Sequence, residues 1–358
     1  MQTTPARSLR GRGRRATFLR TGAVLGALAM TLTACASTAA PKSDDSGKGG
    51  TELSVVGFSV LEAPNEKVLA DFSGTPEGKG ITFATSYGSS GDQSRAVEGG
   101  LAADLVHFSL EPDVTRLVDS GQVASTWKDN ATKGIATSSV VSFVVRPGNP
   151  KKITSWDDLV KPGVEIITPN PASSGSAKWN ILAAWAHVTG NGGSEEDAKA
   201  FVTKLLKNTV ALPSSARDAT TAFSEGSGDV LLSYENEAIT ARAKGADFDY
   251  VVPDDTLLIE NPAAVTTDAA KGAAELLAFL TTPQAQADYA SFGFRPVVDG
   301  VTIPEVTGAN DPANPFPTPG KLFTIDTDFG GWGVANGKFF DENDGIITGI
   351  QADLGKLE

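Results

Sequence analysis

The residue types best suited to binding chemistry lie in a turn at Ser174, Gly175 and Ser176. An apolar, β-like segment from Ile166 precedes this turn, and an apolar helical pattern follows it up to Val188. A helix that begins after such a turn leaves backbone N–H groups without intrahelical partners. Because the side chains are small, an anion can approach these N–H groups at the positive end of the helix dipole. The turn indicates an oxyanion site, although an ordinary capped helix begins with the same residue types.

Two other predicted strand-to-helix junctions have the same small-residue composition. They are Tyr-Gly-Ser-Ser-Gly at 87–91 and Pro-Ser-Ser-Ala at 213–216, and neither contains Lys or Arg. Helix N-termini that converge from several such turns surround an oxyanion with neutral dipoles. Three turns of this kind in one chain therefore favour a binding function over simple capping.

The elements that must position these turns alternate between strand and helix. Strand patterns cover 52–58, 81–86, 104–108, 140–146, 164–168, 209–212, 229–234 and 249–252. Helical periodicity covers 65–72, 92–98, 176–188, 194–206, 217–225, 268–280 and 283–290, before a Pro-rich stretch at 310–319. This alternation predicts parallel α/β layers with ligands at the carboxyl ends of the strands.

The first 34 residues differ in composition from the rest of the chain. Six arginines and no acidic residue occur there, and the apolar run at 21–34 is shorter than the roughly 20 residues that span a bilayer. These features predict an export signal. The arginine pair at 14–15 also resembles a twin-arginine motif with one residue too many, so the export route stays open.

The sole cysteine, Cys35, ends the sequence Leu-Thr-Ala-Cys at 32–35, which resembles the lipobox of bacterial lipoproteins. This resemblance implies that Cys35 is lipidated and becomes the first residue of the mature chain. The segment 35–51, rich in Ser, Gly, Ala, Lys and Asp, predicts a flexible tether between the anchor and a folded body.

The charge of the chain limits its partners. The 358 residues suffice for two domains, and their formal charge of −13 becomes −19 once the six arginines of 1–34 are removed. A protein this acidic does not attract nucleic acid or anionic lipid, because both are negatively charged. We therefore exclude nucleic acid as a partner. Long-range charge also works against an anionic ligand, so its affinity must come from short-range hydrogen bonds.

Catalytic motifs are missing from the sequence. His107 and His187 are far apart and lack the spacing of metal ligands, and neither a nucleophile elbow nor a phosphate loop occurs. We therefore expect a protein that is not an enzyme and has no metal and no cofactor. Both histidines, and the apolar helix that carries Trp179 and Trp185, are expected to serve packing or surface roles.

Residues 169–180, Pro-Asn-Pro-Ala-Ser-Ser-Gly-Ser-Ala-Lys-Trp-Asn, followed by Leu-Ala-Ala-Trp at 182–185, resemble the signature of the prokaryotic sulfate-binding proteins. These are the solute receptors of sulfate/thiosulfate ABC importers. Further blocks keep the family's order and approximate spacing, at 146–150, 156–159, 161–164, 229–232, 235–238, 322–326 and 329–332. The resemblance therefore extends over most of the chain that follows the tether.

The fold that this resemblance implies is α/β, the two-lobed periplasmic-binding-protein fold of type II. Each lobe has a mixed sheet flanked by helices, and the ligand binds in the interlobe cleft. Lobe one is expected at 52–140 plus 256–358 and lobe two at 141–255. The chain crosses twice between the lobes, and these crossings form the hinge.

The resemblance also implies the binding residues. In that family backbone N–H groups, a serine hydroxyl and an indole N–H hold the anion without an ion pair. Matched position by position, the ligand-binding residues are Ser90, Ser174, Gly175, Ser176, Ala216 and Tyr234. Ser176 stands where the family usually has Gly, and Tyr234 takes the indole position, so pocket size and selectivity are open.

Three charged residues lie beside the implied site. Asp92 stands where the family often has Lys, and a carboxylate there pairs well with a helix dipole. If it reached the ligand, it would repel sulfate but accept a proton from hydrogen phosphate. Arg217 and Lys178 follow two of the turns and are expected not to touch the anion directly.

The function implied is a lipid-anchored receptor at the extracytoplasmic face of the membrane. It binds sulfate or thiosulfate as a monomer and delivers it to the permease subunits of an ABC importer. Receptors for molybdate, tungstate or phosphate are the alternatives within the binding class. From another class, a cell-envelope enzyme or a sensor subunit that retains the receptor fold stays open.

Overall fold

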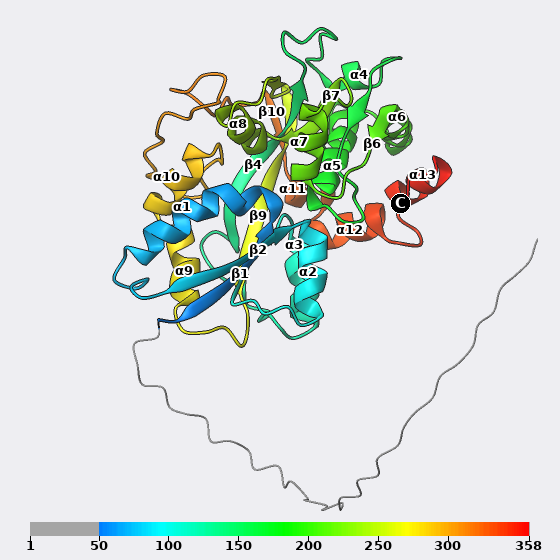
Figure 1. Cartoon of the computed structure of the whole chain (residues 1–358). Helices are drawn as coiled ribbons and strands as arrows, with labels where there is room; N and C mark the ends of the chain where they lie inside the picture. The colour runs from blue at the N-terminus through cyan, green and yellow to red at the C-terminus, as the bar shows by residue number, and fades with distance from the viewer. Residues whose placement is uncertain (1–49, 358) are drawn as a thin grey trace, which may run out of the picture. The chain divides into compact units, whose positions relative to one another are not determined.

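The structure is a computed structural model and describes residues 50–357 (Figure 1). The predicted signal segment 1–34, the lipidation site Cys35 and most of the tether, 35–49, lie outside these residues. Within 50–357, no helix has the length and apolar character needed to cross a membrane.

Ten strands form one mixed sheet in the order β2-β1-β3-β9-β4-β7-β5-β6, with β8 paired to β4 and β10 to β9. They are β1 (Glu52–Phe58), β2 (Thr82–Gly88), β3 (Leu105–His107), β4 (Ile135–Val145), β5 (Ile166–Ile167), β6 (Thr209–Ala211), β7 (Val230–Tyr234), β8 (Asp249–Val251), β9 (Asp255–Val265) and β10 (Lys321–Phe323). The pairs β3/β9, β4/β9, β4/β7 and β4/β8 are antiparallel, and the others are parallel. The purely parallel layers predicted from the alternation are therefore wrong, and the mixed sheet implied by the resemblance is confirmed.

Two long strands, β4 and β9, run side by side through the middle of this sheet and change partners along their length (Figure 1). β4 pairs with β9 up to Val140 and with β7 from Val141. β9 pairs with β10 up to Leu257, with β4 from Leu258 and with β3 from Ala263. The strands β1 to β3 thus lie at one end of the sheet, and β5 to β8 lie at the other.

The helices cover both ends of the sheet. They are the 3-10 helix η1 (Ser59–Leu61), α1 (Glu62–Ser73), α2 (Ser90–Glu98), α3 (Glu111–Asp119), α4 (Trp156–Leu159), α5 (Gly175–Gly190), α6 (Glu195–Asn208), α7 (Ala216–Ser224), α8 (Glu235–Ala243), α9 (Ala273–Leu280), α10 (Pro283–Ser291), α11 (Ile325–Phe329), α12 (Trp332–Phe340) and α13 (Ile346–Asp353).

Three sequence expectations need correction. Helix α9 begins at Ala273 instead of residue 268, because Gly272 has a left-handed φ of 103° that interrupts the helical path. Strand β9 was missed because Pro262 interrupts its pattern. Pro262 is tolerated there because it pairs with Ile135, where the register of β4 shifts. Helices α3, α4, α8 and α11 to α13 also went unpredicted.

Helix α5 lies in the main hydrophobic core and is buried on almost every side, including both of its tryptophans. The C-terminal segment packs onto it. The ring centroids of Trp179 and Trp332 lie 4.7 Å apart, and those of Trp185 and Phe339 lie 4.8 Å apart, both edge to face. These contacts fix the position of α5 and of the turn that precedes it.

Candidate anion-binding site

The three small-residue turns are helix starts in the structure. Ser89, Ser174 and Ser215 are the N-cap residues of α2, α5 and α7, each with extended backbone dihedrals. The Ser215 hydroxyl accepts a hydrogen bond from the N–H of Asp218 and so caps α7. Among the described residues, the side chains of Ser89 and Ser174 make no such cap. The N–H of Ser90 in α2 and the first N–H groups of α5 therefore stay available to an acceptor.

Hydrogen bonds hold the three turns against one another. Both Ser89 Oγ and Ser173 Oγ donate to the backbone oxygen of Ser214, each at 2.7 Å. The N–H of Gly91 donates to the Ser173 oxygen at 3.1 Å. A Cβ at Gly91 would lie 2.9 Å from that same oxygen, so this close approach requires glycine. The structure thus brings together helix starts at Ser90, Gly175 and Ala216, which are well separated in sequence.

Ser109, which follows β3, lies at the centre of this cluster and was not predicted. Its hydroxyl forms a 2.7 Å hydrogen bond with the hydroxyl of Tyr234 at the end of β7. Its carbonyl oxygen accepts from Trp179 Nε1 at 3.0 Å and from Asn261 Nδ2 at 2.9 Å. A Cβ added to Gly175 would lie 2.5 Å from Ser109 Oγ. Its position after a strand was the only signal in the sequence, because no glycine-rich turn accompanies it.

Ser90 takes part in the cluster through a buried carboxylate. Its hydroxyl donates to Asp113 Oδ2 at 2.5 Å and accepts from the N–H of Ser109 at 2.9 Å. Burial raises the pKa of Asp113, against the lowering effect of the Ser90 hydrogen bond. With its hydroxyl proton directed at Asp113, Ser90 can offer an anion its backbone N–H only.

All six predicted binding residues are buried. Tyr234 has no exposed surface, and burial raises the pKa of its phenol, so the hydroxyl keeps its proton near neutral pH. Ser176 Oγ is buried without a hydrogen-bond partner within the described part of the chain. A buried hydroxyl costs free energy unless something accepts from it or donates to it. This atom therefore marks where a ligand atom would be stabilised.

The charged residues beside the site face elsewhere. Asp92 is about half exposed and pairs with Arg95 at 2.5 Å. Arg217 pairs with Glu237 at 2.9 Å, and Lys178 donates to Asn336 Oδ1 at 2.8 Å. The hydrogen bonds described above among the site residues come from neutral donors.

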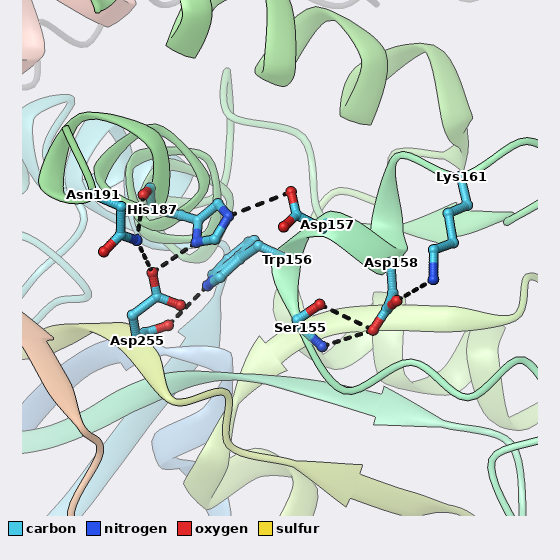
Figure 2. Close-up of polar contacts among 8 residues, drawn as sticks. All are labelled: Ser155, Trp156, Asp157, Asp158, Lys161, His187, Asn191 and Asp255. Atoms are coloured by element: carbon cyan, nitrogen blue, oxygen red, sulfur yellow. Dashed lines mark hydrogen bonds and ion pairs between the residues drawn. The ribbon is translucent and has the colours of Figure 1, made fainter. Parts of the chain in front are cut away.

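Neither histidine belongs to this cluster. His107 is fully buried beside Thr137, at 3.2 Å, and burial lowers its pKa to about 3. His187 lies near the C-terminal end of α5, where its ring contacts Asp255 and Asp157 (Figure 2). Within 50–357, no group of three or more His, Cys, Asp or Glu side chains is arranged to hold a metal ion.

Known proteins are similar to this chain in both sequence and fold. The family described as bacterial extracellular solute-binding protein matches residues 53–295. A sulfate-binding protein of Synechococcus elongatus is 39% identical over 96% of this chain and 98% of its own length. A thiosulfate-binding protein of Pseudomonas aeruginosa is 36% identical over 72% of this chain and 78% of its own length.

Solved structures of known proteins also resemble this chain. The sulfate-binding protein SubI from Mycobacterium tuberculosis superposes with a TM-score of 0.76 at 46% identity, over 81% of this chain and all of that chain. A periplasmic thiamin-binding protein, 20% identical, shares the fold with a TM-score of 0.58 over 71% of this chain and 85% of its own. The chain therefore belongs to the bacterial extracellular solute-binding proteins, in the family of the sulfate-binding proteins.

Proposed function

We propose that this protein binds sulfate, and also thiosulfate, as a desolvated oxyanion at the converging starts of α2, α5 and α7. Backbone N–H groups of Ser90, Gly175 and Ala216 donate, together with the hydroxyls of Ser176 and Tyr234. Ser174, as the N-cap of α5, directs the first N–H groups of that helix at the anion. The observation that carries the proposal is the unpartnered, buried Ser176 hydroxyl beside uncapped helix starts.

A site in which every group that touches the ligand is a donor discriminates between tetrahedral anions, and the nearby carboxylate Asp113 already accepts from Ser90. Sulfate carries no proton at neutral pH, so every one of its oxygens accepts. Hydrogen phosphate brings a donor that would face another donor, and leaving such groups unpaired in a buried site costs about 1–3 kcal/mol. Asp92 is turned to solvent and paired with Arg95, which leaves it unsuited to accept that proton. The names of the relatives, sulfate- and thiosulfate-binding proteins, support the same choice.

Binding is coupled to closure of two lobes around the anion. Lobe one contains 52–140 and continues from 256, and lobe two contains 141–255, with β4 and β9 as the crossings. The hydrogen bonds Ser109–Tyr234 and Gly91–Ser173 then join opposite lobes. The edge-to-face contacts of Trp332 with Trp179 and of Phe339 with Trp185 favour placing residues 321–357 with lobe two, a refinement of the boundary expected from the sequence.

The cellular role that follows is delivery of the anion to the permease subunits of an ABC importer. The protein acts as a monomeric receptor without a cofactor and without catalysis, as the naming of its relatives as binding proteins supports. It works at the extracytoplasmic face of the membrane, held there by a lipid on Cys35.

Isothermal titration calorimetry of extensively dialysed protein with sulfate, thiosulfate, molybdate and phosphate tests the ligand. We expect one tight site for sulfate, competition by thiosulfate and no comparable binding of phosphate. Tight molybdate or phosphate binding without sulfate binding would overturn the proposal in favour of another anion.

The anchor is tested separately with Cys35→Ala. We expect the variant to bind sulfate as the unchanged protein does but to leave the detergent phase in a partitioning experiment. Equal retention of both proteins in the detergent phase would contradict lipidation at Cys35.

A further inference from the structure

A group of cations lines a cavity outside the buried cluster of neutral donors. The cavity has a volume of about 460 Å³, and Arg95 of α2, Arg116 of α3 and Lys178 of α5 line it. Pro171 and Ala172, which precede the Ser173–Ser174 turn, line it as well. We call this space the cationic cavity. The positive charge of these three side chains contrasts with the formal charge of −13 of the whole chain.

The cations of this cavity have unused hydrogen-bonding capacity. Lys178 donates once, to Asn336, although an ammonium has three donors, and its Nζ lies 5.0 Å from the centre of the Phe340 ring. Arg116 has a buried Nε with no hydrogen-bond partner among the described residues, and its one ion pair, with Glu98, is long at 3.5 Å. Donors left in this state cost free energy unless an acceptor occupies the cavity.

The charges around Lys178 are also unbalanced. Burial lowers the pKa of its ammonium, Asp113 raises that pKa, and Arg116 and Arg95 lower it further. Two arginines therefore act on Lys178 against one carboxylate, and Asp113 Oδ2 already accepts from Ser90. Each arginine also has an acidic partner of its own, Asp92 for Arg95 and Glu98 for Arg116. Asp341 and Glu342 also line the cavity, but both are exposed. Asp341 in addition accepts from the N–H groups of Asn343 and Asp344.

We propose that the cationic cavity is a second anion site, which holds a hydrated inorganic dianion between Arg116 and Lys178. Arg95 and Arg116 come from the proposed lobe one and Lys178 from lobe two, so like charges face one another when the lobes close. An anion between them removes this repulsion and adds hydrogen bonds. Its binding is weaker than that of the buried cluster, because the cavity is open to water, and salt screens it. Closure is favoured when the cavity is filled.

The test is equilibrium dialysis of the full mature chain with radiolabelled sulfate, taken to millimolar concentrations. We expect a second, weak equivalent of sulfate beyond the tight one. Arg116→Gln and Lys178→Gln each weaken this second event by about 10-fold and leave the tight affinity within about threefold. The exposed carboxylate variant Glu342→Gln strengthens it. Raising the chloride concentration weakens the second event alone.

Arg242→Gln is the matched control, since Arg242 bonds Asn310 and lies away from the cavity. It should leave both events unchanged. A stoichiometry that stays at one equivalent, or a second event that Arg116→Gln and Lys178→Gln leave intact, overturns the second site. The proposal rests on the proposed function only through the choice of sulfate as probe. If the tight event is missing and the weak one disappears in Arg116→Gln, the proposed function fails and the second site stands.

Discussion

The two ends of helix α5 differ in the chemistry of the groups found there. At its start, Gly175 and Ser176 present neutral donors inside a buried cluster. Near its end, His187 lies between two carboxylates, with Nδ1 at 2.7 Å from Asp255 and Nε2 at 3.7 Å from Asp157 (Figure 2). One helix therefore has neutral donors at its first two residues, suited to an exchangeable ligand, and an ion pair near its end that belongs to the permanent structure.

The contacts at the C-terminal end tie α5 to the sheet. Asn191 Nδ2 also donates to Asp255 Oδ2, at 2.8 Å, and Trp156 Nε1 donates to the Asp255 backbone oxygen at 2.9 Å (Figure 2). Asp255 opens β9, one of the two long central strands. A cation near a helix C-terminus is favourable to the dipole, and the free N–H groups at the opposite end attract anions directly. Helix α5 is thus anchored by an ion pair at one end and presents neutral donors at the other, where Lys178 is bonded to Asn336.

The largest expected effect comes from filling the space at the start of α5. In Gly175→Ala, the new Cβ would lie 2.5 Å from Ser109 Oγ and 2.6 Å from Leu110 Cδ2. Overpacking of this kind costs about 1–3 kcal/mol, and a displaced N–H donor costs about as much again. Calorimetry should show sulfate affinity reduced on the order of 100-fold or more.

Gly337→Ala serves as the control for that experiment. Gly337 is an exposed residue of α12, and a Cβ there meets no described atom within 4 Å. Its sulfate affinity should equal that of the unchanged chain. Equal affinities of Gly175→Ala and Gly337→Ala would show that the start of α5 does not touch the anion.

Tyr234 gives the next largest effect. Tyr234→Phe removes a buried hydroxyl that bonds Ser109, and a hydrogen bond to a charged group contributes about 1.5–3 kcal/mol. Sulfate binding should weaken roughly 10- to 150-fold, and loss of the bond to Ser109 should lower the free energy of unfolding by about 0.5–1.5 kcal/mol. Tyr234→Trp should restore donation and retain sulfate. If the Phe variant binds as tightly as the unchanged chain, Tyr234 only packs beside the ligand.

At the charged end of α5, a substitution should alter stability and leave binding unchanged. Asp255→Asn removes the carboxylate that faces His187, and we expect a loss of about 1–2 kcal/mol in the free energy of unfolding below pH 6. Burial lowers the pKa of His187, but the hydrogen bond and charge of Asp255, with Asp157, outweigh it and raise that pKa above 6.5 overall.

The sign of the pH dependence follows from that raised pKa. The folded state binds the proton of His187 more tightly than the unfolded state, so the stabilisation is complete below pH 6.5 and is lost as the pH rises through the folded pKa. The stability difference between the unchanged chain and Asp255→Asn should therefore shrink from pH 6 to pH 9 in urea titrations. A difference that grows with pH would contradict the charged form of His187.

The smallest effect is expected at the neutral end of α5. If its donors are all uncharged, sulfate affinity should stay within about threefold between about pH 6 and 8, because neither sulfate nor these donors titrate there. Calorimetry over this range provides the measurement. A profile that follows the second ionisation of phosphate, with phosphate bound and sulfate not, would replace sulfate as the ligand.

Local sequence rules predicted some elements well. The strand expected at 52–58 is β1 with the same bounds, and the helix expected from residue 176 begins at Gly175. Both have strong periodic patterns and clear turn residues at their ends. Strand β9 was missed because Pro262 breaks its pattern, and only the pairing with β4 and β3 makes that segment extended.

The residues of the candidate site likewise divide into those that local sequence patterns predict and those that they do not. The helix starts at Ser90, Gly175 and Ala216 follow from small residues after strands, a pattern within a few residues of chain. Ser109 and Asp113 went unpredicted because their roles depend on partners from other elements. The bond between Ser109 and Tyr234 joins residues 125 positions apart.

Local sequence patterns therefore place three helix starts after small-residue turns that contain no Lys or Arg, since turns and periodicity act over a few residues. Capping of α7 by Ser215, and the lack of a side-chain cap at Ser89 and Ser174, emerge only in the fold. Tertiary contacts bring these starts together, join Ser109 to Tyr234, and make Asp113 the acceptor of the Ser90 hydroxyl. The physical reason is that strand order and the paths of β4 and β9 set these contacts, and strand order depends on the packing of the whole core.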